Sequence, residues 1–214
     1  MNTHAINRLV FSTYSASQPA AGTADLVANK VREKLLELAV IQEPIIGLKD
    51  SYGLGDGFLQ QIIFMGCSPA IELEVPDSID SNELNFSFAR LLHVQDLAPF
   101  HGYDFSALQQ VPRCRQCRRS VAPDRQAFID LLEASTNTNT DKQIVCRACN
   151  TAVRLAELDW RKQTAWGNIF IEIFHVYPHE AVPTDAFVQH LSDVSQTPWE
   201  FFYTQADPQF IVSK

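Results

Sequence analysis

Two Cys-x-x-Cys pairs constrain the fold of this chain more than any other feature. Cys114 and Cys117 form the first pair, and Cys146 and Cys149 form the second, so the two pairs use four of the five cysteines. Two such pairs can hold one tetrahedral zinc ion through short turns whose backbone amides point at the sulfurs. The sequence therefore predicts a zinc site with these four cysteines as its ligands.

The segments PRCRQC and IVCRAC, which contain the two pairs, resemble the knuckles of a zinc ribbon. The resemblance covers residues 112–153 and implies a structural metal and a rigid platform, as in zinc ribbons that bind protein, RNA or DNA. The 28 residues between Cys117 and Cys146 are more than a minimal three-stranded ribbon has. In each knuckle the residue after the second cysteine is expected to be left-handed, which suits Asn150 better than Arg118.

Redox-active dithiols and an iron site are the alternatives to zinc. A redox pair needs an environment that lowers the pKa of its first thiol, such as a helix N-terminus or nearby arginines. Duplication of the motif favours a metal over two dithiols. Four thiolates fill a tetrahedral shell and leave no position for a reacting water, so the predicted zinc site is structural and not catalytic.

Positive charge is concentrated around the cysteines, although the whole chain carries a net charge of −8. Residues 113–162 have a balance of +4 and contain eight of the eleven arginines, whereas the remainder has a balance of −12. This asymmetry predicts a surface for an anionic partner, or else a basic segment that docks on its acidic neighbour. The predicted partner-binding residues are Arg113, Arg115, Arg118, Arg119 and Arg147.

These features favour a non-catalytic, zinc-binding adaptor whose partner is another protein. Guanidinium groups bind carboxylates through two parallel hydrogen bonds, which suits recognition of an acidic protein surface. Nucleic-acid binding through the arginine-rich segment is the first alternative, and the net acidity of the chain counts against it. A membrane partner is not expected, because no apolar run approaches the roughly 20 residues that cross a bilayer.

Cys67 is the fifth cysteine, and it follows a predicted strand in the segment MGCSP. An enzyme that uses Cys67 as its nucleophile is the second alternative function. A free cysteine is also among the residue types most often buried in a core. The sequence leaves catalysis uncertain and favours a protein without it.

The expected location is the cytoplasm. The only apolar stretch near the N-terminus, residues 9–11, is too short for the hydrophobic region of a signal peptide. In the cytosol thiols stay reduced, so paired cysteines there favour a metal over a disulfide.

The predicted fold class is α+β, with a mixed sheet, flanking helices and an inserted four-cysteine module that resembles a zinc ribbon. Residues 1–22 are expected to form an irregular arm and residues 23–111 the first part of the core. Residues 112–162 are assigned to the module, and residues 163–214 to a β-α-β unit that completes the core.

Periodicity and turn residues predict the individual elements. Thr184 is a suitable N-cap for one helix, and the apolar run after Gly167 indicates a strand buried on both faces. The predicted helices cover residues 23–42, 124–134 and 184–195, and the predicted strands cover residues 59–65, 70–75, 85–94, 169–176 and 199–203.

Overall fold

The computed structural model describes residues 6–13, 23–65, 71–76, 84–100, 109–134 and 143–206. Its helices are α1 (Thr23–Glu37), α2 (Phe58–Gln61), α3 (Arg125–Ala134), η3 (Leu155–Glu157, a 3₁₀ turn) and α4 (Asp185–Ser195). Its strands are β1 (Ile6–Thr13), β2 (Ile41–Pro44), β3 (Ser51–Leu54), β4 (Ile62–Phe64), β5 (Phe88–Pro99), β6 (Gln143–Val145), β7 (Ala152–Arg154), β8 (Trp166–Phe174), β9 (Ala181–Pro183) and β10 (Trp199–Ala206).

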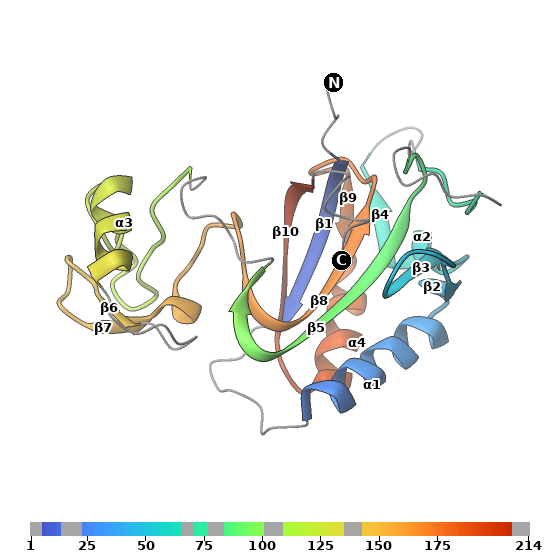
Figure 1. Cartoon of the computed structure of the whole chain (residues 1–214), viewed down its shortest axis with the longest axis horizontal. Helices are drawn as coiled ribbons and strands as arrows, with labels where there is room; N and C mark the ends of the chain where they lie inside the picture. The colour runs from blue at the N-terminus through green and yellow to red at the C-terminus, as the bar shows by residue number, and fades with distance from the viewer. Residues whose placement is uncertain are drawn as a thin grey trace.

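A six-stranded sheet in the order β10-β1-β8-β5-β3-β2 is the centre of the fold (Figure 1). Each pair of neighbouring strands is antiparallel. Every residue of β8 is buried, which confirms the predicted strand with two covered faces. Sheet and helices together confirm the α+β class. None of the helices in the described part of the chain is long and apolar enough to cross a membrane.

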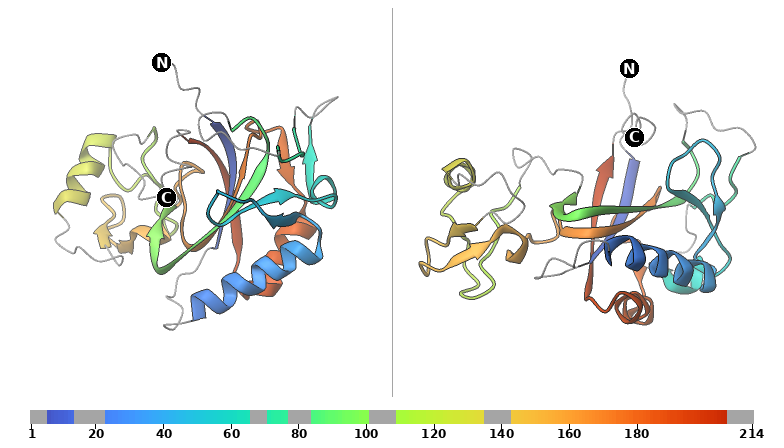
Figure 2. Two further views of the ribbon diagram at one scale, coloured as in Figure 1. Left: turned by 45° about the vertical axis from the view of Figure 1, so that its right-hand side comes forward. Right: turned by 60° about the horizontal axis from the view of Figure 1, so that its bottom comes forward.

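Helices α1 and α4 lie side by side on one face of the sheet (Figure 2). Both are amphipathic, and each points its apolar stripe toward the strands because burial removes that surface from water. Phe187 of α4 meets Phe11 of β1 edge to face, with 5.4 Å between the ring centroids. The opposite face of the sheet has its own apolar clusters, which include Phe88 stacked on Phe174 and Phe100 beside Phe202.

The C-terminal segment is the predicted β-α-β unit, made of β8, α4 and β10. The hydroxyl of Thr184 accepts a hydrogen bond from the backbone N–H of Phe187, so the predicted N-cap is confirmed. β8 and β10 run in the same direction, but β1 lies between them and is antiparallel to both. The connection from β8 to β10 therefore passes across β1, and β8 and β10 do not pair with each other.

The irregular arm predicted for residues 1–22 is wrong for residues 6–13, which form β1. Leu9, Val10 and Phe11 are fully buried, and so is Ser12. Polar residues flank this short apolar run, and the strands that satisfy its backbone lie about 160 to 200 residues further along the chain. Local patterning carries no signal for such distant pairing.

Three of the predicted strands also need correction. In the segment predicted as a strand over residues 59–65, α2 comes first and β4 follows, with β4 pairing β9 outside the main sheet. Residues 71–75 of the strand predicted over 70–75 have no regular secondary structure. The strand predicted over residues 85–94 begins at Phe88 and continues to Pro99.

The segment of residues 112–162, hereafter the four-cysteine module, lies off the β10 side of the sheet (Figures 1 and 2). The predicted helix over residues 124–134 is confirmed as α3, and η3 follows directly after β7. An antiparallel pair, β6 and β7, completes the regular structure described in the module. The boundaries between the predicted domains remain a prediction.

Candidate metal centre

The four cysteines of the two pairs meet at one point of the four-cysteine module. The Sγ atoms of Cys114, Cys117, Cys146 and Cys149 all lie within 4.8 Å of one another. Cys114 and Cys146 are fully buried, and the other two are half-buried. The Sγ–Sγ distance is 3.9 Å from Cys114 to Cys149 and from Cys117 to Cys146. Each short distance joins one knuckle to the other, so the site closes across the module.

These distances fit a tetrahedral metal site with four sulfur ligands. Four sulfurs placed about 2.3 Å from a central zinc ion form a tetrahedron with edges of about 3.8 Å. The two measured cross-knuckle distances of 3.9 Å differ from that edge by about a tenth of an ångström. They are far longer than the roughly 2.05 Å of a disulfide bond. The side chains are therefore placed to hold a metal ion together.

The two knuckles have the same backbone hydrogen bonds. The N–H of Arg118 donates to the carbonyl of Cys114 at 2.8 Å, and the N–H of Asn150 donates to that of Cys146 at 2.8 Å. Both donors are left-handed, with φ of 59° for Arg118 and 57° for Asn150. A left-handed asparagine is common, whereas a left-handed arginine is strained. The expected left-handed position is thus confirmed in both knuckles, including the one with the less suitable residue.

The insertion between the pairs contributes part of the apolar core of the module. Phe128 of α3 is fully buried and meets Trp160 edge to face at 5.9 Å between ring centroids. Cys114 and Cys146 belong to the same buried cluster as these side chains. The backbone N–H of Arg147 donates to the carbonyl of Val121, which ties the second knuckle to the segment that leads into α3. The insertion therefore packs on the cysteine site and supports it.

Without a metal, the thiols differ in their tendency to ionise. Burial raises the pKa of the Cys146 thiol. Hydrogen bonds with the hydroxyl and backbone of Thr151 lower the pKa of the Cys149 thiol, whose Sγ lies 3.5 Å from that hydroxyl oxygen. A metal ion binds thiolates, so binding at Cys146 must displace a tightly held proton.

The five arginines predicted to bind a partner are all exposed. Arg113, Arg115 and Arg118 of the first knuckle line a cleft of about 890 Å³ between the module and the β10 side of the sheet. Arg119 and Arg147 do not belong to its lining. The structure therefore separates the predicted set into three arginines at the cleft and two outside it.

Cys67, the candidate nucleophile, lies outside the described residues. None of the described histidines belongs to the group of four cysteines. His93 pairs with Asp25 of α1 at 2.6 Å, and the ring of His179 lies beside Tyr203. The described residues therefore do not test the alternative in which Cys67 is the nucleophile of an enzyme.

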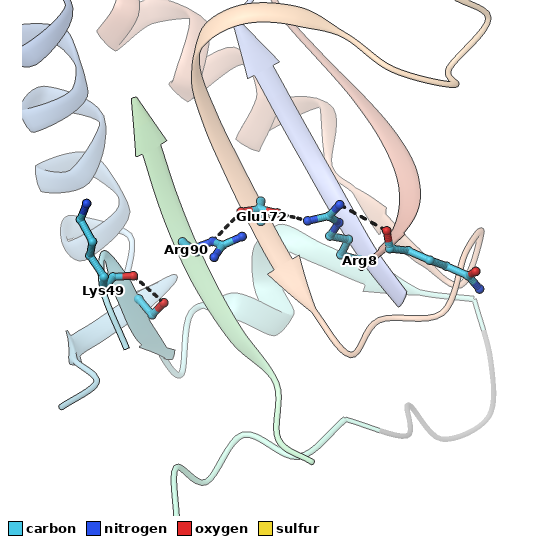
Figure 3. Close-up of polar contacts among 6 residues, drawn as sticks. Arg8, Lys49, Arg90 and Glu172 are labelled. Atoms are coloured by element: carbon cyan, nitrogen blue, oxygen red, sulfur yellow. Dashed lines mark hydrogen bonds and ion pairs between the residues drawn. The ribbon is translucent and has the colours of Figure 1, made fainter. Parts of the chain in front are cut away.

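A buried charge cluster within the sheet is a feature that sequence analysis missed. Glu172 of β8 is completely buried and receives Arg8 of β1 at 2.5 Å and Arg90 of β5 at 2.7 Å (Figure 3). The guanidinium of Arg8 also lies 4.8 Å from the ring centroid of Phe100 and donates to the carbonyl of Gln205. Two guanidinium groups share the single negative charge of Glu172. The ring of Phe100 and the carbonyl of Gln205 therefore supply further stabilisation of the buried charge of Arg8.

Comparison of the chain with protein-family models, with curated proteins and with solved structures found no match. Any function has to be inferred from the geometry of its own residues.

Proposed function

We propose that this chain is a non-catalytic adaptor in which a structural zinc ion holds the two knuckles and the first knuckle presents arginines to an acidic partner protein. The observation that carries the proposal is the closed set of four sulfurs within 4.8 Å, beside exposed arginines. Four thiolates complete the shell of a zinc ion, whose role is then to fix the surrounding backbone. The cytoplasmic location predicted from cysteine usage belongs to the same proposal.

Zinc is favoured over the alternatives by its ligands and by their arrangement. Thiolates select soft or borderline metals, and zinc is the common occupant of a tetrahedral site with four cysteines. A pair of independent redox dithiols has no need to meet, whereas here two sulfur–sulfur distances of 3.9 Å run between the pairs. Iron also binds to four thiolates, and elemental analysis distinguishes it from zinc.

A protein partner is favoured over nucleic acid by the mixed charge near the knuckle. The cleft beside Arg113, Arg115 and Arg118 is also lined by the carboxylates of Asp159, Asp185 and Glu200. A polypeptide offers N–H donors for those carboxylates, whereas a phosphate backbone offers a negative charge at every residue. An acidic protein segment can therefore satisfy both signs of charge.

Two measurements test this function. Elemental analysis of the reduced protein should find one zinc ion per chain, and a chelator should remove it with loss of structure around the knuckles. Fluorescence anisotropy should then show binding of labelled polyglutamate in preference to a single-stranded oligonucleotide across a salt series.

Iron in place of zinc would overturn the assignment of the metal. A metal-free protein with reversibly cycling thiols would overturn the structural site, and preference for the oligonucleotide would favour the nucleic-acid alternative.

A further inference from the structure

The cleft between the first knuckle and the sheet is bounded by an edge strand. Among the described strands, β10 lies at the end of the sheet with β1 as its neighbour. Trp199, Glu200, Phe201 and Phe202 of β10 line the cleft. Consecutive residues of a strand point to opposite faces, so a cleft lined by all four follows the edge of β10 and not one face of the sheet.

Cations gather on the wall opposite this edge. The cleft is lined by Arg113, Arg115 and Arg118 of the first knuckle and by Arg161 and Lys162 of the loop that follows η3. With the three carboxylates of the lining, the formal balance of the cleft is about +2. The whole chain is acidic, with a net charge of −8, so this positive cleft is a local exception. Such a concentration attracts an anionic ligand.

Backbone strain coincides with these cations. Arg118, Arg161 and Lys162 are all left-handed, with φ of 59°, 56° and 59°. The left-handed backbone at Arg118 belongs to the knuckle, and Arg161 and Lys162 are the central residues of a turn that the N–H of Gln163 closes on the carbonyl of Trp160 at 3.1 Å. This turn fixes the direction in which the two cations leave the backbone. It places Lys162 with its Nζ 4.8 Å from the ring centroid of Phe201 on β10.

The lining also contains a polar atom without a partner. Thr164 is 3% exposed, and its Oγ1 has no hydrogen-bond partner within the part of the chain that the structure describes. A buried hydroxyl left unpaired costs free energy that a ligand group can recover. Thr164 lines the cleft beside the cations, so a ligand in the cleft is placed to supply the missing bond.

One ion pair spans the cleft and shows that its two walls are close enough to share a ligand. Arg115 of the knuckle lies 3.8 Å from Glu200 of β10, and both side chains remain 44% exposed. A ligand carboxylate can replace Glu200 at Arg115 without leaving either charge in an apolar environment.

We infer that the cleft binds an extended acidic segment of a partner protein, with the backbone of that segment along the outer edge of β10 and its carboxylates on Arg115, Arg118 and Lys162. Strand addition satisfies the edge backbone groups and is a common mode of peptide recognition. A volume of about 890 Å³ is enough for several residues of extended peptide. This inference rests on the proposed function and specifies where and how the partner binds.

The test uses the full chain and labelled peptides in which glutamate alternates with valine. The double variant Arg115→Gln/Arg118→Asn removes two cleft charges, and asparagine keeps the left-handed backbone at position 118. The matched control Arg119→Gln/Arg147→Gln removes the same charge from the module outside the cleft. The cleft variant should lose at least about tenfold in affinity, which is the contribution of a hydrogen bond to a charged group, and the control less than about threefold. Elemental analysis of each variant confirms that the metal is retained.

A second peptide tests the edge of β10. Methylation of alternate backbone nitrogens removes the donors that strand addition needs, so affinity should fall at least about tenfold. Equal losses in the cleft and control variants would overturn the cleft and leave the proposed function in place, since the charge of the whole module would then decide binding. Equal affinity for the methylated peptide would overturn the placement along β10. Failure of the unmodified chain to bind any acidic peptide or polyglutamate would overturn the proposed function itself.

Discussion

Arginines of the six-stranded sheet and arginines of the four-cysteine module have opposite environments. Arg8 and Arg90 of the sheet are 6% and 4% exposed, and both pair with Glu172. The knuckle arginines are exposed on a surface beside a cleft. A buried guanidinium must be compensated within the fold, whereas an exposed one is solvated and available to a ligand. Charge is therefore part of the core in one region and part of the surface in the other.

The two regions also differ in how they are stabilised. Buried side chains of β1, β5, β8, α1 and α4 form the largest apolar cluster, between the sheet and its two helices. The cluster of the module is smaller and includes Cys114 and Cys146 themselves. A small apolar core seldom suffices without a metal or a disulfide. The sheet should thus hold its structure by burial, and the module by burial together with its ligands.

Removal of the metal should give the largest effect and the clearest contrast between the regions. We expect Cys146→Ser, or a chelator, to unfold β6, β7 and α3 while the sheet persists, because the apparent free energy of zinc binding in small zinc peptides is about 10–16 kcal/mol. Hydrogen exchange should show lost protection at Ile144 and Val153 and retained protection at Ile171. Cys67→Ser is the matched control, since it changes a cysteine outside the two pairs, and it should keep the metal. Loss of protection at Ile171 would show that the regions fold as one unit.

Substitution of Glu172 should break the sheet in a way that has no counterpart in the module. Glu172→Gln keeps the shape of the side chain but leaves two buried guanidinium groups without their carboxylate. The expected loss in the free energy of unfolding is about 3–5 kcal/mol, measured by urea denaturation. Glu37→Gln, which removes an exposed pair with Lys34 at 2.8 Å, should cost less than about 1 kcal/mol. A similar cost for both variants would mean that water or the surrounding groups compensate the charges at Arg8 and Arg90.

Local sequence signals predicted the parts of this molecule whose partners are near in the chain. The spacing of Cys114 and Cys117 defines a knuckle by itself, and Thr184 caps a helix whose N–H groups lie within one turn. The run from Gly167 is apolar throughout because both faces of β8 are covered. In each case a few neighbouring residues contain the physical cause.

The parts that sequence missed depend on residues that the fold brings together from afar. Arg8, Arg90 and Glu172 stand in three different strands, and a charged residue inside an apolar strand gives no hint of its partner. β1 was missed because both of its neighbours come from the C-terminal part of the chain. The cleft joins Arg115 to Glu200 across 85 positions of sequence, so the basic segment and the strand over residues 199–203 were each predicted, but not their approach to each other.

Loss of a helix cap provides a matched pair of small effects, one in each region. Thr184 caps α4, and the carboxylate of Asp124 accepts from the N–H of Ala127 at 2.8 Å at the start of α3. Thr184→Ala and Asp124→Ala should each cost about 1 kcal/mol. The first should lower the unfolding transition of the sheet, and the second should lower that of the module and weaken its hold on the metal. Competition with a chelating dye measures the second effect. If Thr184→Ala weakened the metal site as much as Asp124→Ala does, the two regions would be coupled.

The smallest expected effect is the pH dependence that His175 adds to the stability of the sheet. Burial lowers the pKa of His175, which follows β8, and its Nε2 has no hydrogen-bond partner within the described residues. The unfolded chain then protonates His175 more readily than the folded chain does. The contribution of neutral His175 to stability is therefore complete above about pH 6.5 and is lost as the pH falls through the lower pKa of the folded state. His175→Asn suits the left-handed backbone there, where φ is 60°, and should flatten the fall in stability between about pH 7 and pH 5. Urea denaturation at the two pH values measures the slope, with His190→Asn on α4 as the control that keeps His175. A slope unchanged by His175→Asn would assign the acid sensitivity to other groups, and the cysteine ligands, which must lose protons to bind the metal, would be the first to examine.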